Sequence, residues 1–257
     1  MLQFFEWFWR AVGLSARLGM QEGRSFQGFL YYRHIICLQN GEATKAALAF
    51  LLGIFLCIAV PYLLGSLNAA ILISTKKYHD DIRTHGSGNA GMTNMGRVFG
   101  KKAVYLTLAG DVAKQVLSVL VGVLLMGELG AYVAGLFCML GHIFPVYFEF
   151  KGGKGVLTAA AMVLCIDYQV FLIGMLIFAL TVLITRYVSL GSMIAGFALP
   201  GIVYYAAKIR GIPPSIPALG FSMFIGLTLI IMHRSNIKRL MEGKENRISF
   251  KKKKKEE

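Results

Sequence analysis

The chain has 257 residues, of which 56% are hydrophobic and only 16% are charged, and its mean hydropathy is +0.61. This composition excludes an ordinary soluble domain of this length, and several apolar stretches approach or exceed the length that crosses a bilayer. The net charge of +14 does not indicate nucleic-acid binding, because the basic residues lie mainly between apolar segments and at the C-terminus. We therefore expect an all-α, polytopic membrane helical bundle.

The N-terminal region, residues 1–45, precedes the first clear span. Its first part, "MLQFFEWFWRAVGLSARLGMQ", alternates aromatic residues with arginines, as an amphipathic helix on a membrane surface does. It lacks the apolar core and cleavage site of a signal peptide. The alternative is a dispensable extension. The sequence thus predicts an extension of unclear role at 1–45, a membrane domain at 46–247 and a charged tail at 248–257.

About seven transmembrane helices are predicted, and Pro61 is expected to kink the first. The fourth apolar stretch, 156–166, is the shortest and is shorter than a full crossing requires, so whether it spans stays open. The predicted spans are 46–74, 103–126, 129–147, 156–166, 168–185, 190–207 and 216–232.

The lysines and arginines between the spans predict the orientation. Alternate connections, together with the C-terminal run, hold most of them: Lys76, Lys77, Arg83, Arg97, Lys101, Lys102, Lys151, Lys154 and Arg186. The other connections hold little beyond Lys208 and Arg210. The positive-inside rule then puts the N-terminus outside and the C-terminus in the cytoplasm.

Four polar stretches fall on the predicted cytoplasmic side. They are "THGSGNAGMTNMGRVFGKK" (84–102), "GHIFPVYFEFKGGKG" (141–155), "TRYVSLGS" (185–192) and "HRSNIKRLMEGKEN" (233–246). Ordinary connections need fewer glycines and amides. Irregular backbone at membrane depth persists only where it lines a polar cavity, so we expect a site on this face.

The stretch "FEFKGGKGVLT" (148–158) resembles a nucleotide-binding P-loop, but a Walker A loop needs a glycine where Phe148 stands and Ser or Thr where Gly155 stands. The nucleotide interpretation therefore fails. The glycines still permit backbone N–H groups to turn toward an anion, and Lys154 adds a charge.

The first polar loop carries hydroxyl and amide side chains beside an arginine whose planar fork suits phosphate oxygens. The alternative is a capped loop in which Asn and Ser are turn formers. The residues concerned are Ser87, Asn89, Thr93, Asn94 and Arg97.

Other polar side chains recur at helical spacing. Asp111 and Lys114 share a helical face inside a span, which fits either a functional site or a structural ion pair. The remaining candidates are Arg186, Ser189 and Ser192, then His233 and Asn236, and finally His142; for each the alternative is an ordinary interfacial residue. The four cysteines form no C-x-x-C pair and are interpreted as packing residues.

Taken together, "GSGNAGMTNMGR", "GHIFPVYFEFKGGKGV" and "HRSNIKRLMEGKEN" resemble the three motifs of the bacterial acyl-phosphate:glycerol-3-phosphate acyltransferases. "YLLGSLN" and "TRYVSLGS" are similar as well, and the likeness runs from about residue 55 to residue 247. The resemblance implies a multi-pass enzyme of the bacterial inner membrane that faces the cytoplasm. Its substrates would be acyl phosphate and glycerol 3-phosphate, and its products lysophosphatidic acid and phosphate, in the first step of phospholipid synthesis.

The resemblance also implies roles for residues. Ser87 and Arg97 match the important serine and arginine of the first motif, and His233 and Asn236 match the histidine and asparagine of the third. The glycine-rich second motif, associated with glycerol 3-phosphate, maps to Gly152, Gly153, Lys154 and Gly155. The glutamate of the third motif, with a more structural role, maps to Glu245.

This chemistry needs no cofactor, nucleotide or metal, because acyl phosphate is a mixed anhydride with a good leaving group. The enzyme must hold two anions together and stabilise charge on the departing phosphate. Three candidates for the base stay open: His233, then His142, then a substrate phosphate. Ser87 is expected to orient a substrate; the alternative is that it is acylated.

Two rival classes are a phosphate-ester transporter and a non-catalytic assembly factor. A transporter should show an internal repeat and sites at the midplane, which the sequence does not suggest. An assembly factor leaves the polar loops without a purpose. A metal-dependent headgroup transferase would need closely spaced acidic residues, and the spans carry isolated ones. Acyl chain preference and oligomeric state are not fixed by sequence.

Overall fold

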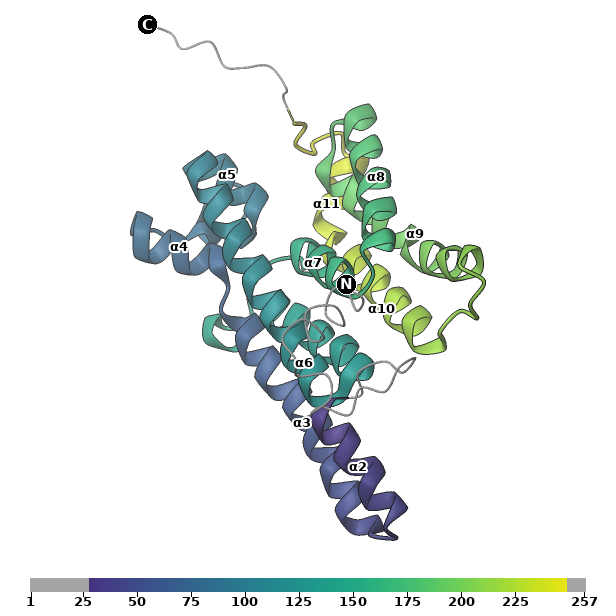
Figure 1. Cartoon of the computed structure of the whole chain (residues 1–257). Helices are drawn as coiled ribbons and strands as arrows, with labels where there is room; N and C mark the ends of the chain where they lie inside the picture. Colours follow the sequence, from purple (N-terminus) through teal and green to yellow (C-terminus); the bar gives the residue numbers. More distant parts are fainter. Residues whose placement is uncertain (1–27, 249–257) are drawn as a thin grey trace, which may run out of the picture. The chain divides into compact units, whose positions relative to one another are not determined.

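The computed structural model describes residues 28–248, and every regular element within them is a helix, which confirms the all-α prediction (Figure 1). The predicted surface helix in residues 1–21 and most of the charged tail lie outside these residues. The chain forms two compact units that divide after Tyr168. The first holds α2 (Phe29–Gln39), α3 (Ala43–Ser66), α4 (Ala69–Tyr78), η1 (Ile82–Thr84), α5 (Met92–Phe99), α6 (Lys101–Ile143), η2 (Val146–Phe148) and α7 (Val156–Ile166).

Helix α6 is a hairpin of two helical arms. The Nζ of Lys114 lies 3.0 Å from Nδ1 of His142, whereas 28 residues of straight helix would separate them by about 42 Å. The chain reverses at Met126 and Gly127, whose backbone is not helical, and Gly127 takes a φ of 62°. The first arm agrees with the span predicted at 103–126, whereas the second ends at Ile143, before the predicted end at 147.

The first predicted span, 46–74, is not one helix. Helix α3 ends at Ser66 and α4 begins at Ala69, so the break falls at Leu67–Asn68 and Pro61 lies within α3. The physical reason is that Asn68 caps the new helix, because its Oδ1 accepts a hydrogen bond from the Ile71 N–H at 3.1 Å. The polar residues Ser66 and Asn68 mark this break within the otherwise apolar stretch.

The second unit holds α8 (Tyr168–Thr185, which begins at the boundary), α9 (Val188–Ile209), α10 (Ile216–Met232) and α11 (Arg234–Met241). Helices α9 and α10 approach closely where Gly196 and Gly226 meet, since a Cβ on Gly226 would clash with the carbonyl of Gly196. Helix α11 continues from α10 after a bend of 54° at His233.

Each of the seven predicted apolar segments falls mostly on helix, but their number as spans stays a prediction. By length and composition, four helical stretches among the described residues suit a membrane crossing, or five if α10 and α11 count as one bent span. That count takes α6 as one stretch, although it doubles back. Helix α7 has only 11 residues, fewer than a full crossing needs.

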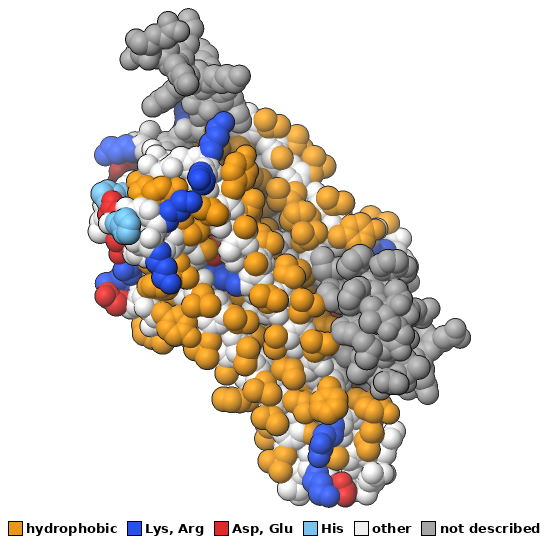
Figure 2. All heavy atoms as spheres, turned by 60° about the vertical axis from the view of Figure 1, so that its left-hand side comes forward, with side chains coloured by type: hydrophobic (Ala, Val, Ile, Leu, Met, Phe, Trp, Pro, Cys, Tyr) orange, Lys and Arg blue, Asp and Glu red, His pale blue; other side chains and the backbone are white. Residues whose placement is uncertain are grey.

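The surface agrees with a membrane environment. Large apolar side chains are exposed along α3, α8 and α10, including Leu51, Leu176 and Leu227. Figure 2 shows such side chains covering one face of the molecule. Charged side chains lie at the two ends of this face, over α4 and α5 at one end and at the turn between α2 and α3 at the other. All four cysteines are buried as free thiols, as expected of packing residues.

Part of the predicted N-terminal extension is integral to the first unit. Helix α2 packs against α3 and α6, burying Leu30 and Cys37. Gly28, with φ +76°, lies so close to the backbone of the α6 reversal that a Cβ would clash with Met126 and Gly127. The described part of residues 1–45 therefore has a packing role that the sequence did not indicate.

A truncation tests this role. We expect a chain beginning at Glu42 to insert but to unfold at a lower temperature than a chain beginning at Gly28. Van der Waals packing holds membrane helices together, and removal of α2 would lose the packing of Leu30 and Cys37 against α3 and α6. Thermal unfolding of both chains in detergent measures the difference. Equal Tm values would show that α2 contributes nothing to stability.

Candidate active site

The first polar loop is held by the buried amide of Asn94. Its Oδ1 accepts a hydrogen bond from the Ser87 N–H at 3.0 Å, and its Nδ2 donates to the carbonyls of Ile82 and His85 at 3.2 and 2.9 Å. Gly86 has φ +60° and leaves no room for a Cβ beside Asn94. Asn94, predicted to bind substrate, thus uses its amide to shape the loop that displays Ser87.

Around this loop the other first-motif candidates are more open. Ser87, Thr93 and Arg97 are exposed, while Asn89 is half-buried. Thr93 and Arg97 lie one turn apart on α5, so they share a face of that helix. The first motif therefore presents a hydroxyl, a second hydroxyl and a guanidinium from one short segment.

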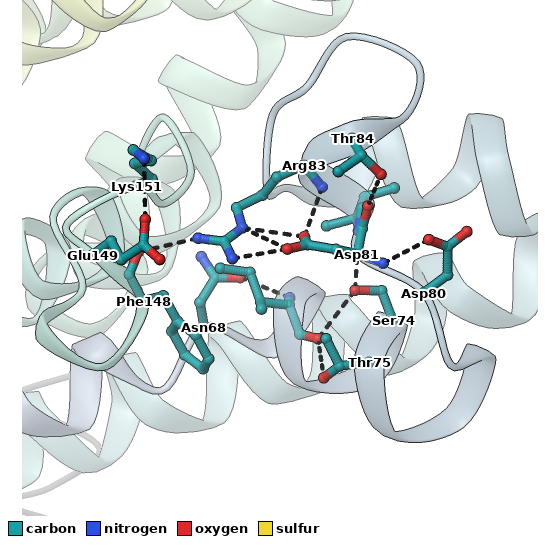
Figure 3. Close-up of polar contacts among 12 residues, drawn as sticks. Asn68, Ser74, Thr75, Asp80, Asp81, Arg83, Thr84, Phe148, Glu149 and Lys151 are labelled. Carbon is teal, nitrogen blue, oxygen red and sulfur yellow. Dashed lines mark hydrogen bonds and ion pairs between the residues drawn. The ribbon is translucent and has the colours of Figure 1, made fainter.

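Arg83 joins the first loop to the second motif (Figure 3). Its Nε and Nη2 donate to the Asp81 carboxylate at 2.8 to 3.1 Å, and Nη1 donates to the carbonyl of Phe148 at 3.1 Å. The hydrogen bonds from Arg83 lower the pKa of Asp81 below its ordinary value. From the sequence, Arg83 is expected only as one of the basic residues of this connection, and the only local sign of its role is an aspartate two residues earlier.

A second connection runs through Asn68, at the start of α4. Its Nδ2 donates to the carbonyl of Ala90 at 3.4 Å. The same carbonyl is close to the second motif, because a Cβ built on Gly153 would come within 2.8 Å of it. The first and second motifs are thus neighbours, in contact through main chain.

The glycines of the second motif serve close packing. The Gly152 and Gly153 N–H groups donate to the carbonyls of Ile143 and His142, each at 3.1 Å. A Cβ at Gly152 would clash with the His142 carbonyl, and one at Gly153 with the His142 ring. The expectation that glycine N–H groups of this loop turn toward an anion is therefore wrong for Gly152 and Gly153 in this conformation.

Beyond these two glycines the loop leads into a helix. Gly155 caps the N-terminus of α7 with φ +81°, a left-handed conformation that suits glycine. Lys154 immediately precedes this helix start. The positive end of a helix dipole favours an anion, so α7 and Lys154 together provide a suitable place for a phosphate.

His142 is buried with only 3% of its surface exposed. Its Nδ1 faces Lys114 at 3.0 Å and Asp111 at 3.4 Å, while its Nε2 edge lies against Gly153. A ring placed in this way supports the second loop. Direct contact between His142 and a substrate stays a prediction.

In the second unit, the carboxylate of Glu245 lies at the centre of a cluster of polar side chains. Its Oε1 accepts hydrogen bonds from Ser189 at 2.8 Å and from Asn236 at 2.7 Å, and its Oε2 accepts one from Arg239 at 2.8 Å. Burial raises the pKa of Glu245, but these donors outweigh burial and hold it below the ordinary value. The cluster agrees with the structural role that the resemblance implied for this glutamate.

The remaining predicted residues flank this cluster. His233 lies between α10 and α11, and its Nδ1 is 2.7 Å from the Leu229 carbonyl. Ser192 is buried and donates to the Val188 carbonyl at 2.9 Å, so its hydroxyl hydrogen is used within α9. Arg186 adopts φ +64°, and its carbonyl accepts from the Ile248 N–H at 2.9 Å.

Replacing Glu245 tests the cluster. Glu245→Gln should lower the free energy of unfolding at neutral pH by about 1–3 kcal/mol, because an amide N–H₂ cannot accept from all three donors. A carboxylate whose pKa is lowered by folding stabilises the protein at pH values above the pKa that it has in the unfolded chain. This stabilisation is lost as the pH falls through the pKa that it has in the folded protein. The difference from wild type should therefore shrink in acid.

Thermal unfolding at pH 7 and near pH 4 measures this change. Glu242→Gln is the matched control, since Glu242 is exposed and its nearest lysine contacts are 3.4 and 4.0 Å long. A Glu245→Gln protein as stable as the Glu242→Gln protein would contradict the structural role.

Comparison with known proteins identifies the family. The profile of the glycerol-3-phosphate acyltransferase family matches residues 55–243. Glycerol-3-phosphate acyltransferase 2 of Bacillus anthracis is 39% identical over 75% of this chain and 98% of its own length. The enzyme of Syntrophotalea carbinolica is 40% identical over 75% of this chain and 96% of its length.

Solved structures agree. The glycerol 3-phosphate form of PlsY (YgiH), an integral membrane glycerol 3-phosphate acyltransferase, matches with a TM-score of 0.68 at 35% identity, over 76% of this chain and 96% of PlsY. Its lysophosphatidic acid form matches with a TM-score of 0.66 at 34% identity, over 76% and 95%. This chain is a multi-pass membrane protein and belongs to the glycerol-3-phosphate acyltransferase family.

Proposed function

We propose that this protein transfers a fatty acyl group from acyl phosphate to glycerol 3-phosphate. The acceptor hydroxyl oxygen attacks the acyl carbonyl carbon, and the bond from that carbon to the phosphate oxygen breaks. The electron pair leaves with inorganic phosphate, and the hydroxyl proton passes to a base. The products are lysophosphatidic acid and phosphate, and the step begins phospholipid synthesis.

The observation that carries the proposal is the contact between the first two motifs. The loop that displays Ser87 and the loop that carries Lys154 meet at Ala90 and Gly153 and are tied by Arg83. A reaction between two phosphate-bearing substrates needs cationic and hydroxyl groups close together. Membership of the family supports the same reaction.

Three cations are proposed to hold the substrate phosphates: Arg97, Lys154 and Arg186. Arg97 is exposed on α5, where its guanidinium can turn its planar fork to an anion. Lys154 and the start of α7 are assigned to the phosphate of glycerol 3-phosphate. Asn89, Thr93 and Gly155 are proposed to complete binding in the first unit, and Ser192 in the second.

His233 is the proposed base. A carbonyl only accepts hydrogen bonds, so the Nδ1 that lies 2.7 Å from the Leu229 carbonyl carries a proton. In a neutral ring the lone pair is then on Nε2, the form a base requires. The Nδ1 of His142 is engaged with Lys114 and Asp111, which makes His142 the weaker candidate.

Ser87 and Asn236 are proposed to orient the reacting groups. The Ser87 hydroxyl lies on a loop fixed by Asn94, which suits a positioning role. The Nδ2 of Asn236 donates to Glu245, which fixes the direction of that amide. A leaving phosphate of low basicity makes a covalent acyl-enzyme unnecessary.

The cellular setting follows from the same proposal. We place the protein in the bacterial inner membrane, with the N-terminus outside and the motifs facing the cytoplasm, where glycerol 3-phosphate is available. The charge of the motif-bearing connections supports this orientation. Residues 46–247 are proposed as the acyltransferase domain, with 248–257 as a cytoplasmic tail.

Substrate choice tests the function. Purified protein should form labelled lysophosphatidic acid from labelled glycerol 3-phosphate with acyl phosphate, and far less with acyl-CoA or acyl carrier protein. Mass spectrometry of the protein with donor alone should show no acyl group on Ser87. Product with acyl-CoA alone would refute the donor, no product with any donor would refute the function, and an acylated Ser87 would replace direct transfer by a covalent intermediate.

A change at Lys154 tests the phosphate assignment. Lys154→Ala should mainly raise the KM for glycerol 3-phosphate by about ten- to a hundredfold, because a charge-assisted contact worth about 1.5–3 kcal/mol is lost. Steady-state kinetics with acyl phosphate saturating gives this value. Lys151→Ala is the control, since Lys151 is exposed and pairs with Glu149. An unchanged KM in Lys154→Ala would contradict the assignment.

A further inference from the structure

Three buried ionisable side chains meet inside the first unit. Asp111 and Lys114 are 1% and 6% exposed and form an ion pair at 2.8 Å, and His142 lies 3.4 Å from the same Asp111 oxygen. The i,i+3 spacing that placed Asp111 and Lys114 on one helical face is confirmed as a contact. Burying an ion pair is expensive, and apolar residues of similar volume often stabilise a protein as well or better.

Lys114 makes more contacts than an ion pair requires. Besides Asp111, its Nζ lies 2.9 Å from the Gly65 carbonyl, 3.2 Å from the Leu67 carbonyl and 3.0 Å from His142 Nδ1. An ammonium has three N–H donors, and the two carbonyls and the imidazole nitrogen match that number. The approach to Asp111 Oδ1 lacks hydrogen-bond geometry and is an ionic contact. The donors therefore serve mainly the carbonyls and the imidazole.

The residues that Lys114 contacts are connected to both motif loops. Gly65 and Leu67 form the C-terminal end of α3, and the next residue, Asn68, holds the Ala90 carbonyl of the first loop. On the other side, His142 accepts from the Gly153 N–H and packs its ring against that glycine. Lys114 thus connects the support of the first loop with the support of the second.

We propose that Asp111 and Lys114 are a positioning pair that sets the spacing between the two motif loops. Lys114 fixes the end of α3 on one side and the His142 ring on the other, and Asp111 pairs with the ammonium and keeps it in place. Their effect on catalysis rests on the proposed function. A displacement of about 1 Å in a catalytic group can cost about a hundredfold in rate, so loss of the pair should affect turnover beyond its effect on stability.

The main test is the double variant Asp111→Asn with Lys114→Met, which removes both charges at similar volume and leaves no buried charge unpaired. Gln115→Met is the matched control, because buried Gln115 donates to the Gly135 carbonyl at 3.0 Å and joins the arms of α6 without reaching either loop. Each protein is compared with wild type for Tm, for kcat and KM toward glycerol 3-phosphate, and for hydrogen–deuterium exchange.

We expect the double variant to lose about ten- to a hundredfold in kcat/KM and to exchange faster in residues 84–99 and 148–156. Gln115→Met should lower Tm while keeping wild-type KM and loop exchange. Wild-type kcat/KM and loop exchange in the double variant would overturn the proposal. If wild type itself makes no product, the proposed function fails, and loop exchange alone decides the positioning role.

Should the double variant fail to fold, Lys114→Arg decides the question. It keeps the ion pair, but a planar guanidinium cannot direct donors to the Gly65 carbonyl and to His142 in the same way. We expect a Tm near that of wild type with kcat/KM lowered about tenfold. Unchanged kinetics and unchanged loop exchange in Lys114→Arg would overturn the proposal.

Discussion

A helix that ends among apolar surroundings leaves carbonyl groups that something must satisfy, and here Lys114 satisfies two at the end of α3. Lys114 is about 20 Å along α6 from its first residue, so α3 stops well short of the start of α6. Helices α4 and α5 pack around that first stretch of α6. The first motif can exist as an irregular loop because α3 ends where it does.

The glycines of the motifs have a common physical reason. At Gly86, Gly152 and Gly153 a Cβ would meet a polar atom of Asn94 or His142. Glycine permits these groups to approach the backbone, so that side-chain amides and main-chain carbonyls hold loops that have no regular secondary structure. Exposed groups such as Ser87 and Arg97 are then displayed from a fixed frame.

The sequence predicted the helical class, the family and the Asp111–Lys114 contact, because apolar runs, long motifs and i,i+3 spacing are local signals. It did not predict the break at Leu67–Asn68, although the polar residues Ser66 and Asn68 interrupt the apolar run there, or the packing of α2. The direction of the Gly152 and Gly153 N–H groups also depends on where the end of α6 lies. Such features arise from contacts between distant segments, which one sequence does not reveal.

The hairpin in α6 limits where the chain can accept insertions and deletions of residues. The chain reverses within Met126 and Gly127, and the arms touch where Gly122 and Gly130 meet. One residue added or removed in either arm would rotate everything beyond it by about 100°. Lys114 and His142, on opposite arms, would then no longer face each other. Surface connections elsewhere tolerate insertions and deletions, but α6 between Lys114 and His142 should accept substitutions only.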